Sequence, residues 1–502
     1  MEFCAFIRFF FKSFSLSSIF IQLLSAFARI LIQSGPPNKP CGCEICQGFL
    51  TRSWSKKFHN LCDWYSHLLQ KSPTATIHIH VADNIITANP QNVEHILRTR
   101  FDNYPKGKPF SAILGDLLGK GIFNADGDSW IFQRKISSLQ LGSVSVRSYA
   151  FRVISSEIQN RLIPLMESIC DETEHVVDLQ DVFRRFAFDT ICRFSFGLDP
   201  GCLHRTLPES EFASAFDKAS KLSAERAMTA TPLVWKMKRF FNLGSEKELR
   251  SAIKAINILA DEVIKQKREM GSDQTQTQND LLSRFMETIS DDDYLRDIVV
   301  SFLLAGRDTI ASALTSFFWL LAKNPEIISK IREESNRVMG ESDRVLPKFE
   351  ELQKMNYLQA AVYESLRIFP PVQFDSKFAL QPDVLPDGSF VNVGTRVTYH
   401  PYAMGRMEKI WGSDCLEFKP ERWLNDGMFT PANPFNYPVF QAGVRVCLGK
   451  EMALVEMKCV AVSFIRRFDI QLVESGETTL RFAPGLTATI CGGVPVAIRR
   501  RR

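Results

Sequence analysis

The stretch that decides the fold of this 502-residue chain is Phe440-Gln441-Ala442-Gly443-Val444-Arg445-Val446-Cys447-Leu448-Gly449. The residues that follow, Lys450–Lys458, are typical of a helix, so Cys447 lies directly before a helix N-terminus. Gly443 and Gly449 allow the backbone to turn tightly and to approach a flat ligand closely. Because the N–H groups of a helix N-terminus stabilise a thiolate, we expect a lowered pKa for Cys447.

Two interpretations of this cysteine compete. A buried structural role is the common fate of a free cysteine. A thiolate bound to haem iron instead pushes electron density onto the metal and favours O–O cleavage. The spacing decides: Phe-x-x-Gly-x-Arg-x-Cys-x-Gly resembles the signature of the cytochrome P450 superfamily at every fixed position, with Phe440, Gly443, Arg445, Cys447 and Gly449. The resemblance, which runs from Cys43 onward, implies a haem b cofactor (iron protoporphyrin IX), with Cys447 as axial iron ligand and Phe440 and Gly443 beside the haem.

Periodicity indicates the fold class. From about residue 126 to residue 370, apolar residues recur at three- and four-residue spacing, which predicts helices. Alternating stretches at Thr76–Val81 and Asn84–Thr87 predict a small sheet, and short β runs such as Leu486–Ile490 occur near the C-terminus. We therefore predict a mainly α (α+β) layout. The resemblance implies the cytochrome P450 fold, a large helical domain with a long central helix plus a smaller β-rich part.

The N-terminal segment Ser13–Ala28 carries no charge and has basic residues on both sides. A cleaved signal peptide fits the basic start, the short apolar stretch and the small residues Ala26 and Ala28. A retained anchor fits if the span continues through Ile32 and Arg29 snorkels, since it then reaches the ~20 residues that a bilayer needs.

The downstream resemblance favours the anchor, and we divide the chain accordingly. Residues 1–33 are expected to form an N-terminal membrane anchor, and residues 34–502 a haem-thiolate monooxygenase catalytic domain. The breaker cluster Ser34–Pro40 separates them, and the polar stretch Gly271–Gln278 predicts a surface loop. The expected location is the endoplasmic reticulum membrane, with the catalytic domain on its cytosolic side.

Charge and cysteine content exclude other classes. Lys plus Arg at 61 against Asp plus Glu at 56 gives a net charge of +5, which is too small to indicate nucleic-acid binding. The twelve cysteines are scattered, unlike a disulfide framework, and indicate reduced thiols. Cys41, Cys43 and Cys46, with His59 or Cys62, could offer zinc four soft ligands. No second paired-cysteine knuckle follows, so free thiols are the favoured interpretation.

A second motif, Ala305-Gly306-Arg307-Asp308-Thr309, lies within a helix predicted from about Asp292 to Lys323. In isolation, Thr309 would be expected to bond to its own helix carbonyl and Asp308 to be exposed. In the superfamily that the chain resembles, this motif is catalytic. The resemblance implies that Gly306 leaves room for dioxygen, that Thr309 hydrogen-bonds during O–O cleavage, and that Asp308 helps to deliver protons.

Two further sets of residues take their roles from the resemblance. Glu364 and Arg367 lie about one helical turn apart, and with Arg422 they imply a structural ion trio beneath the haem. Trp130 and Arg134 share a helix face, and with Arg445 they imply contacts to the haem propionates. Packing of Trp130 over an arginine stem is compatible with that role.

Finer features resemble the plant fatty-acid ω-hydroxylase branch, among them Arg307 and Phe101–Gly107. The segments Cys43–Cys46, Phe374–Ala379 and Tyr399–Met407 resemble the jasmonoyl-isoleucine 12-hydroxylase/carboxylase group. This implies insertion of one oxygen atom from O2 at the terminal (ω) carbon of a carboxylate-bearing oxylipin or fatty acid. The expected substrate is jasmonoyl-isoleucine, with 12-hydroxylation and onward oxidation to the 12-carboxylate, in jasmonate hormone catabolism. Val444 departs from the usual Pro or Ala and puts haem affinity in question.

The sequence also indicates which redox partner and which membrane contact to expect. It shows no Gly-rich dinucleotide fingerprint after a strand, so electrons are expected from NADPH–cytochrome P450 reductase. The expected docking face comprises Lys135, Arg445, Lys450 and Lys458. Aromatic and basic residues in Pro232–Phe241, Trp235 among them, predict a second membrane contact. The expected substrate-pocket residues are Phe110–Leu117, Val372–Phe374 and Leu486–Ile490.

Alternative functions remain open. They are a general fatty-acid ω-hydroxylase, a haem-thiolate isomerase that rearranges hydroperoxides without reductase, a non-catalytic haem or lipid binder, and a secreted disulfide protein. Thr309 and Asp308 argue against the isomerase, which needs no proton delivery.

Overall fold

A computed structural model describes residues 41–171, 176–204, 211–229, 232–271, 280–340, 344–473 and 480–501. The predicted anchor at residues 1–33 and the breaker cluster Ser34–Pro40 lie outside the described residues, as do residues 272–278 of the predicted loop. The description below therefore concerns the predicted catalytic domain.

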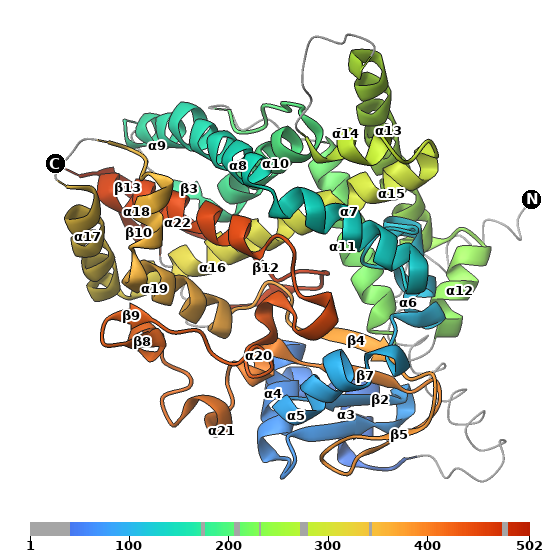
Figure 1. The fold of residues 1–502 in the computed structure, drawn as a ribbon. Coiled ribbons are helices and arrows are strands. Elements are labelled where there is room, and N and C mark those ends of the chain that lie inside the picture. The colour runs from blue at the N-terminus through green and yellow to red at the C-terminus, as the bar shows by residue number, and fades with distance from the viewer. Residues whose placement is uncertain are drawn as a thin grey trace, which may run out of the picture.

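Helices dominate the described chain and fill the upper part of the view in Figure 1. The predicted mainly α fold is confirmed, including the helical stretch between residues 126 and 370. The α-helices are α3 (Glu44–Thr51), α4 (Leu61–Lys71), α5 (Pro90–Glu94), α6 (Gly107–Leu118), α7 (Gly127–Gly142), α8 (Val144–Glu157), α9 (Ile163–Cys170), α10 (Leu179–Phe196), α11 (Glu211–Ala227), α12 (Pro232–Phe240), α13 (Gly244–Gly271), α14 (Leu281–Met286), α15 (Asp292–Leu303), α16 (Thr309–Lys323), α17 (Pro325–Met339), α18 (Phe349–Gln353), α19 (Asn356–Ile368), α20 (Pro401–Met404), α21 (Glu408–Trp411) and α22 (Lys450–Arg467).

Short 3-10 and π segments connect or interrupt these helices. The 3-10 segments are η1 (Ser53–Lys56), η2 (His80–Ala82), η4 (Phe101–Asn103), η7 (Pro420–Trp423), η8 (Pro438–Phe440) and η9 (Gly443–Arg445). The π segments are η3 (His95–Thr99), η5 (Ile158–Leu162) and η6 (Leu304–Asp308).

The largest sheet has the order β1 (Thr76–Ile79), β2 (Asn84–Thr87), β7 (Arg396–Tyr399) and β4 (Asp375–Phe378). Only β2 and β7 pair in parallel within it, and they join segments more than 300 residues apart (Asn84 pairs with Arg396). In Figure 1 this sheet lies below the helices, built from blue and orange parts of the chain. Since its strands come from both ends of the sequence, the sheet fixes the C-terminal region, which carries Cys447, against the N-terminal one.

The remaining strands are short. A three-stranded sheet has the order β10 (Phe468–Leu472), β13 (Pro495–Arg500), β3 (Val176–Asp178), and two-stranded sheets pair β5 (Asp383–Val384) with β6 (Phe390–Val391), β8 (Leu424–Asn425) with β9 (Met428–Phe429), and β11 (Phe482–Ala483) with β12 (Thr489–Ile490). The strand predicted at Thr76–Val81 ends early because η2 and the left-handed Asp83 turn the chain. The run predicted at Leu486–Ile490 forms a strand over its last two residues.

The central helix is confirmed with the predicted bounds: α15, η6 and α16 continue one another from Asp292 to Lys323. Asp291 caps its start by accepting from the N–H groups of Asp293 and Tyr294, and Pro325 follows its end. By length and composition it is the one helix of the described residues that could cross a membrane, but 78% of its apolar window is buried inside the protein. It is therefore the core helix of this fold.

Candidate active site

The loop that carries Cys447 is held by its own backbone and by close packing. The N–H of Cys447 donates to the carbonyl of Phe440 at 2.8 Å. Gly443 has φ +63°, and a Cβ there would overlap the carbonyl oxygen of Leu97 in η3. Gly443 is therefore required by the turn that its positive φ allows and by contact with the backbone of Leu97. A Cβ on Gly449 would meet no protein atom within 4 Å.

A cavity of about 290 Å³ opens above this loop. Cys447 and Gly449 border it from the loop, and Ala305, Gly306 and Thr309 border it from the central helix. Most of its other lining side chains are apolar, among them Ile122, Phe123, Ile191, Phe194 and Phe302. The Cys447 loop and the central-helix motif therefore border the same largely apolar cavity.

The residues around this cavity fit haem b. The Cys447 sulfur opens into the cavity, and the space beside Gly449 is free of protein atoms, as a flat macrocycle needs. Arg445 Nε is buried and, among the described residues, has no hydrogen-bond partner. A propionate carboxylate would satisfy it, because an unpaired buried charged donor is costly.

The thiol of Cys447 does not show the lowered pKa that we expected. It has accessible surface only because it opens into the cavity; protein surrounds it otherwise, and this burial raises its pKa. The backbone N–H groups of Gly449 and Lys450 and the charges of Arg134 and Lys450 act in the opposite direction without outweighing burial. A metal cation would favour the ionised sulfur, because it deprotonates a coordinating thiol.

Arg445, Trp130 and Arg134 lie together at the cavity. The Arg445 guanidinium carbon lies 4.5 Å from the centre of the Trp130 ring, and that of Arg134 lies 5.8 Å from it. Arg445 donates to Asp126 Oδ1 at 2.6 Å, and Arg134 donates to the carbonyl of Val446. All three line the cavity, so the structure brings the predicted propionate contacts to one place.

Two lysines at the same cavity were missed. Lys106 Nζ lies 2.5 Å from Asp375 Oδ1, and Lys377 Nζ lies 3.7 Å from Asp375 Oδ2. Both lysines are buried and line the cavity, and burial lowers the pKa of each. Two lysine amines thus share one carboxylate, and a bound anion at the cavity would favour their protonated forms. These residues lie far apart in the sequence, because Lys106 precedes α6 and Asp375 and Lys377 belong to β4, so their proximity is visible only in the structure.

The motif on the central helix coincides with the π segment η6, a feature that often marks functional sites in helices. A Cβ on Gly306 would overlap the Ile191 side chain of α10, so the glycine allows α10 to pack closely. Gly306 also lines the cavity, together with Ile191. Thr309 lines the cavity, and its Oγ1 donates to the Ala305 carbonyl at 2.5 Å.

Asp308 faces a different space from its neighbour Thr309. It borders a second cavity of about 180 Å³, together with Arg184, Asp217 and Ser312. Arg307 Nη1 donates to Asp308 Oδ1 and to Asp217 Oδ1, both at 2.7 Å. Burial raises the pKa of Asp308, against the lowering effect of Arg307. Asp308 is thus a buried, paired acid, whereas an isolated motif predicted an exposed one.

Glu364, Arg367 and Arg422 meet in the protein interior. Glu364 accepts from Arg367 Nε and Nη2 at 2.7 Å and from Arg422 Nε at 3.2 Å. The side chains of Glu364 and Arg367 are fully buried. Arg367 also donates to the carbonyls of Cys415 and Glu417, so the trio joins α19 to the segment that leads into η7.

Several surface predictions need correction. Lys458 is buried and donates to the Leu352 carbonyl, and Arg445 is paired with Asp126 inside the protein, so neither belongs to a docking face. Lys135 is exposed, as predicted. Trp235 is buried against Arg226, whose guanidinium carbon lies 4.9 Å from its ring, so Trp235 cannot meet a membrane.

The predicted substrate-pocket residues also change. Val372 lines the first cavity, but no residue of Phe110–Leu117 or Leu486–Ile490 does. Val444 is 43% exposed and lies outside the cavity lining, so its difference from the usual residue falls on the surface.

Comparison with known proteins agrees with this arrangement. The family model for Cytochrome P450 matches residues 35–489. Cytochrome P450 94C1 of Arabidopsis thaliana is 60% identical over 491 residues, which cover 97% of this chain and 98% of that protein. Cytochrome P450 94B1 of the same plant is 44% identical, with 97% and 98% covered. Cytochrome P450 94A1 of Vicia sativa is 42% identical, with 89% and 88% covered.

Proposed function

Because the chain belongs to the cytochrome P450 family and is a haem b monooxygenase, we propose that it oxidises the terminal carbon of a carboxylate-bearing oxylipin or fatty acid. Jasmonoyl-isoleucine is the proposed substrate, with 12-hydroxylation and onward oxidation to the 12-carboxylate. The observation that carries this proposal is the match to the cytochrome P450 94 relatives along almost the whole chain, since these form the fatty-acid ω-hydroxylase and jasmonoyl-isoleucine hydroxylase branch.

The cavity suits such a substrate. Its lining is mainly apolar, as an alkyl end requires, and its charged groups gather around Arg445, Lys106 and Lys377. Cys447 would ligate the haem iron. Arg445, Trp130 and Arg134 would hold the propionates with help from the two lysines, and Phe440 and Gly443 would shape the loop. The bound haem supplies the activation of dioxygen that a thiolate ligand favours.

The central helix would supply hydrogen bonds and protons. Thr309 Oγ1 lies on the cavity and can exchange its bond to the Ala305 carbonyl for one to a ligand. Asp308 borders the second cavity and holds its proton to higher pH than an ordinary aspartate, because burial raises its pKa. A proton would thus pass from the polar cavity, through Asp308, toward Thr309. Gly306 would act by letting α10 pack beside this segment.

NADPH–cytochrome P450 reductase is the proposed electron donor. The proposed docking face surrounds the loop of Cys447 and includes exposed Lys135, half-buried Lys450 and the exposed apolar residues Val444 and Val446. The proposed location is the endoplasmic reticulum membrane with the catalytic domain in the cytosol. The exposed Leu233, Met237, Phe240 and Phe241 of α12 and the residue after it would form a second lipid contact.

A first experiment compares wild type with Cys447→Ala in the carbon-monoxide difference spectrum of the reduced protein. The thiolate-type band should appear in wild type and vanish in the variant. Reconstitution with the reductase should then show NADPH consumption and one added oxygen atom with jasmonoyl-isoleucine. Equal rates with dodecanoic acid would indicate a general fatty-acid ω-hydroxylase. Conversion of a fatty-acid hydroperoxide without NADPH would indicate an isomerase, and absence of turnover would indicate a non-catalytic binder.

A second experiment tests the membrane contact. In a form without residues 1–33, Phe240→Glu with Phe241→Glu should lower binding to anionic liposomes, whereas Val384→Glu, at an exposed apolar site on β5, should not. Equal liposome binding by the α12 variant and the unsubstituted form would contradict the proposal.

A further inference from the structure

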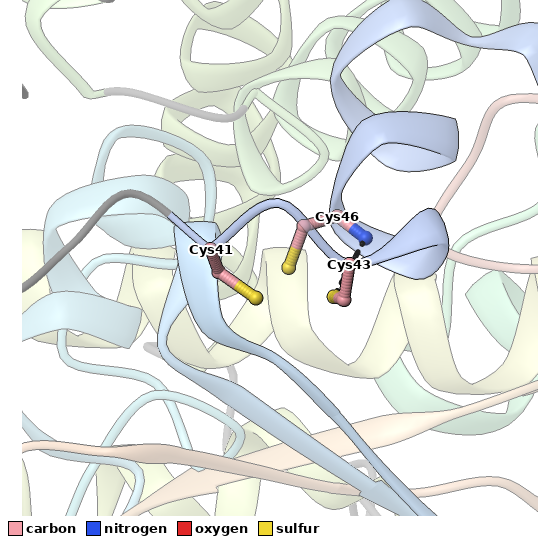
Figure 2. A group of neighbouring side chains, drawn as sticks. All are labelled: Cys41, Cys43 and Cys46. Atoms are coloured by element: carbon pink, nitrogen blue, oxygen red, sulfur yellow. Dashed lines mark hydrogen bonds between the residues drawn. The ribbon is translucent and has the colours of Figure 1, made fainter.

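Three cysteines gather at the start of the described chain. Among the described residues, Cys41, Cys43 and Cys46 are the group of potential metal ligands whose ligand atoms all lie within 4.8 Å of one another. Figure 2 shows the three side chains converging, with their sulfur atoms turned toward a common centre. The proposed oxidation chemistry uses none of them.

The surroundings of the three sulfurs differ in a way that suits a bound ion. Cys46 is fully buried in the apolar core beside the four-stranded sheet, Cys41 is half-buried, and Cys43 is exposed. Cys43 Sγ accepts from the N–H of Cys46 at 3.4 Å, a bond that supports a sulfur anion. The cluster is therefore buried on the side of Cys46 and open to solvent on the side of Cys43.

The fourth ligand that the sequence suggested does not join the group. Neither His59 nor Cys62 belongs to the cluster. Cys62 Sγ donates to Gln373 Oε1 at 3.2 Å and packs with Ile368 and Tyr402 in a separate part of the core. A tetrahedral ion here would keep one position for solvent.

We propose that Cys41, Cys43 and Cys46 bind one Zn²⁺ ion through three sulfur atoms, with a water molecule as fourth ligand. Zinc prefers thiolate ligands in a tetrahedron with Zn–S distances of about 2.3 Å. The three sulfurs already lie within 4.8 Å of one another, so a single ion could contact all three once they draw together around it. Binding would exchange three thiol protons for the ion, which leaves a net charge of −1 on the complex. The ion would tie the chain at Cys41 to α3 and, through Cys46, to the core of the sheet.

The test uses the full-length haem protein, reduced with a phosphine, equilibrated with Zn²⁺ and desalted. We expect about one zinc per haem, and zinc-edge X-ray absorption should show three sulfurs at about 2.3 Å and one lighter atom. Cys43→Ser removes the exposed ligand and should lower zinc affinity by at least ~10-fold, because losing even a residue that only hydrogen-bonds to a metal ligand costs about that much. Cys491→Ser is the matched control, because Cys491 is also an exposed free cysteine. The carbon-monoxide difference spectrum confirms that each variant is folded.

A second measurement needs no substitution. Zinc should protect Cys41 and Cys43 of the wild-type protein from alkylation, leave Cys491 reactive, and lose this effect when a chelator is added. Equal zinc affinity in wild type and Cys43→Ser, a shell with four sulfurs, or protection that is the same with and without zinc would overturn the proposal. A disulfide within the cluster under these reducing conditions would overturn it as well.

Discussion

Two ion clusters, one around Glu364 and one around Asp308, both combine carboxylate and arginine side chains and differ in how completely the central carboxylate is bonded. Glu364 accepts from Arg367, Arg422, the N–H of Lys419 and Trp423 Nε1. The Asp308 cluster borders a cavity, and its partner Asp217 has a side chain 37% exposed.

This difference in hydrogen bonding indicates which of the two carboxyl groups can change its protonation state. A carboxylate surrounded by donors is fixed in its ionised form. Removing Glu364 would leave the buried guanidinium of Arg367 without its counter-charge, whereas Arg422 would keep its ion pair with Asp414. A carboxyl beside a polar cavity can exchange a proton with solvent, and burial raises the pKa of Asp308. We therefore infer that the Glu364 cluster maintains the fold and that the Asp308 cluster serves turnover.

The largest effect is expected from Glu364→Gln. It leaves the fully buried Arg367 facing a neutral amide, while Arg422 keeps its pair with Asp414, and we expect a loss of ~3–5 kcal/mol in the free energy of unfolding. The yield of protein with the thiolate-type carbon-monoxide band should collapse, and with it the activity. Glu421→Gln is the control, since it removes the half-exposed pair with Lys330 and should cost less than ~1 kcal/mol. A wild-type melting temperature for Glu364→Gln would end the distinction between the clusters.

Asp308→Asn should separate turnover from stability. The variant keeps the shape of the side chain but cannot relay a proton, so the rate of product formation should fall by about 10²-fold. Haem content and melting temperature should stay near those of wild type. Because proton transfer then limits the rate, the solvent deuterium isotope effect should increase. An unchanged isotope effect, with the rate lowered only in proportion to lost haem, would assign Asp308 to the fold.

Asp217→Asn should have a smaller effect, below about 10-fold in rate, because Asp217 only assists Asp308. The negative charge of Asp217 contributes to the raised pKa of Asp308. Without the Asp217 carboxylate, Arg307 pairs with Asp308 alone. The loss of the negative charge and the stronger pairing with Arg307 both lower the pKa of Asp308. If protonated Asp308 supports turnover, the alkaline fall of the rate–pH profile should move to lower pH. A shift to higher pH would contradict this coupling, and Asp469→Asn, at a distant surface pair, should leave the profile in place.

The sequence predicted the parts of this site that are local in the chain. The order of Phe440, Gly443, Arg445 and Cys447 indicates the haem loop, and the apolar spacing from Asp292 to Lys323 indicates the central helix. Both depend on contacts within one segment. The mainly α fold was predictable for the same reason, since helical periodicity is a short-range property.

The parts that the sequence could not predict depend on distant segments. Lys106 and Lys377 meet only because β4 lies beside the start of α6, and the burial of Lys458 and Trp235 depends on which helix face is covered. Gly443 and Gly306 were noted correctly as special, but the atoms that require them belong to Leu97 and Ile191. A glycine in a motif indicates close approach without saying which atom approaches.

Another buried carboxyl, Glu456 on α22, differs from both clusters because burial is not compensated by a neighbouring charge. It borders the cavity, and among the described residues no partner lies within hydrogen-bond distance of its Oε1. Burial raises its pKa to about 8. In the unfolded chain a glutamate titrates near 4.3, so folding takes up a proton between these values. The contribution of Glu456 to the free energy of unfolding is therefore fully present below about pH 4.3. It is lost as the pH rises toward about 8, by at most ~1.4 kcal/mol per pH unit.

Glu456→Gln should remove this pH dependence while leaving the rate of turnover nearly unchanged. Relative to wild type, the variant should gain melting temperature as the pH rises from about 5 to about 8, with no further gain above that. Thermal unfolding of the haem protein across this range provides the measurement. Glu451→Gln, on the exposed side of the same helix, should follow wild type at every pH. Parallel curves for wild type and Glu456→Gln would show that Glu456 is ionised in the folded protein throughout this range, and would contradict a pKa raised by burial.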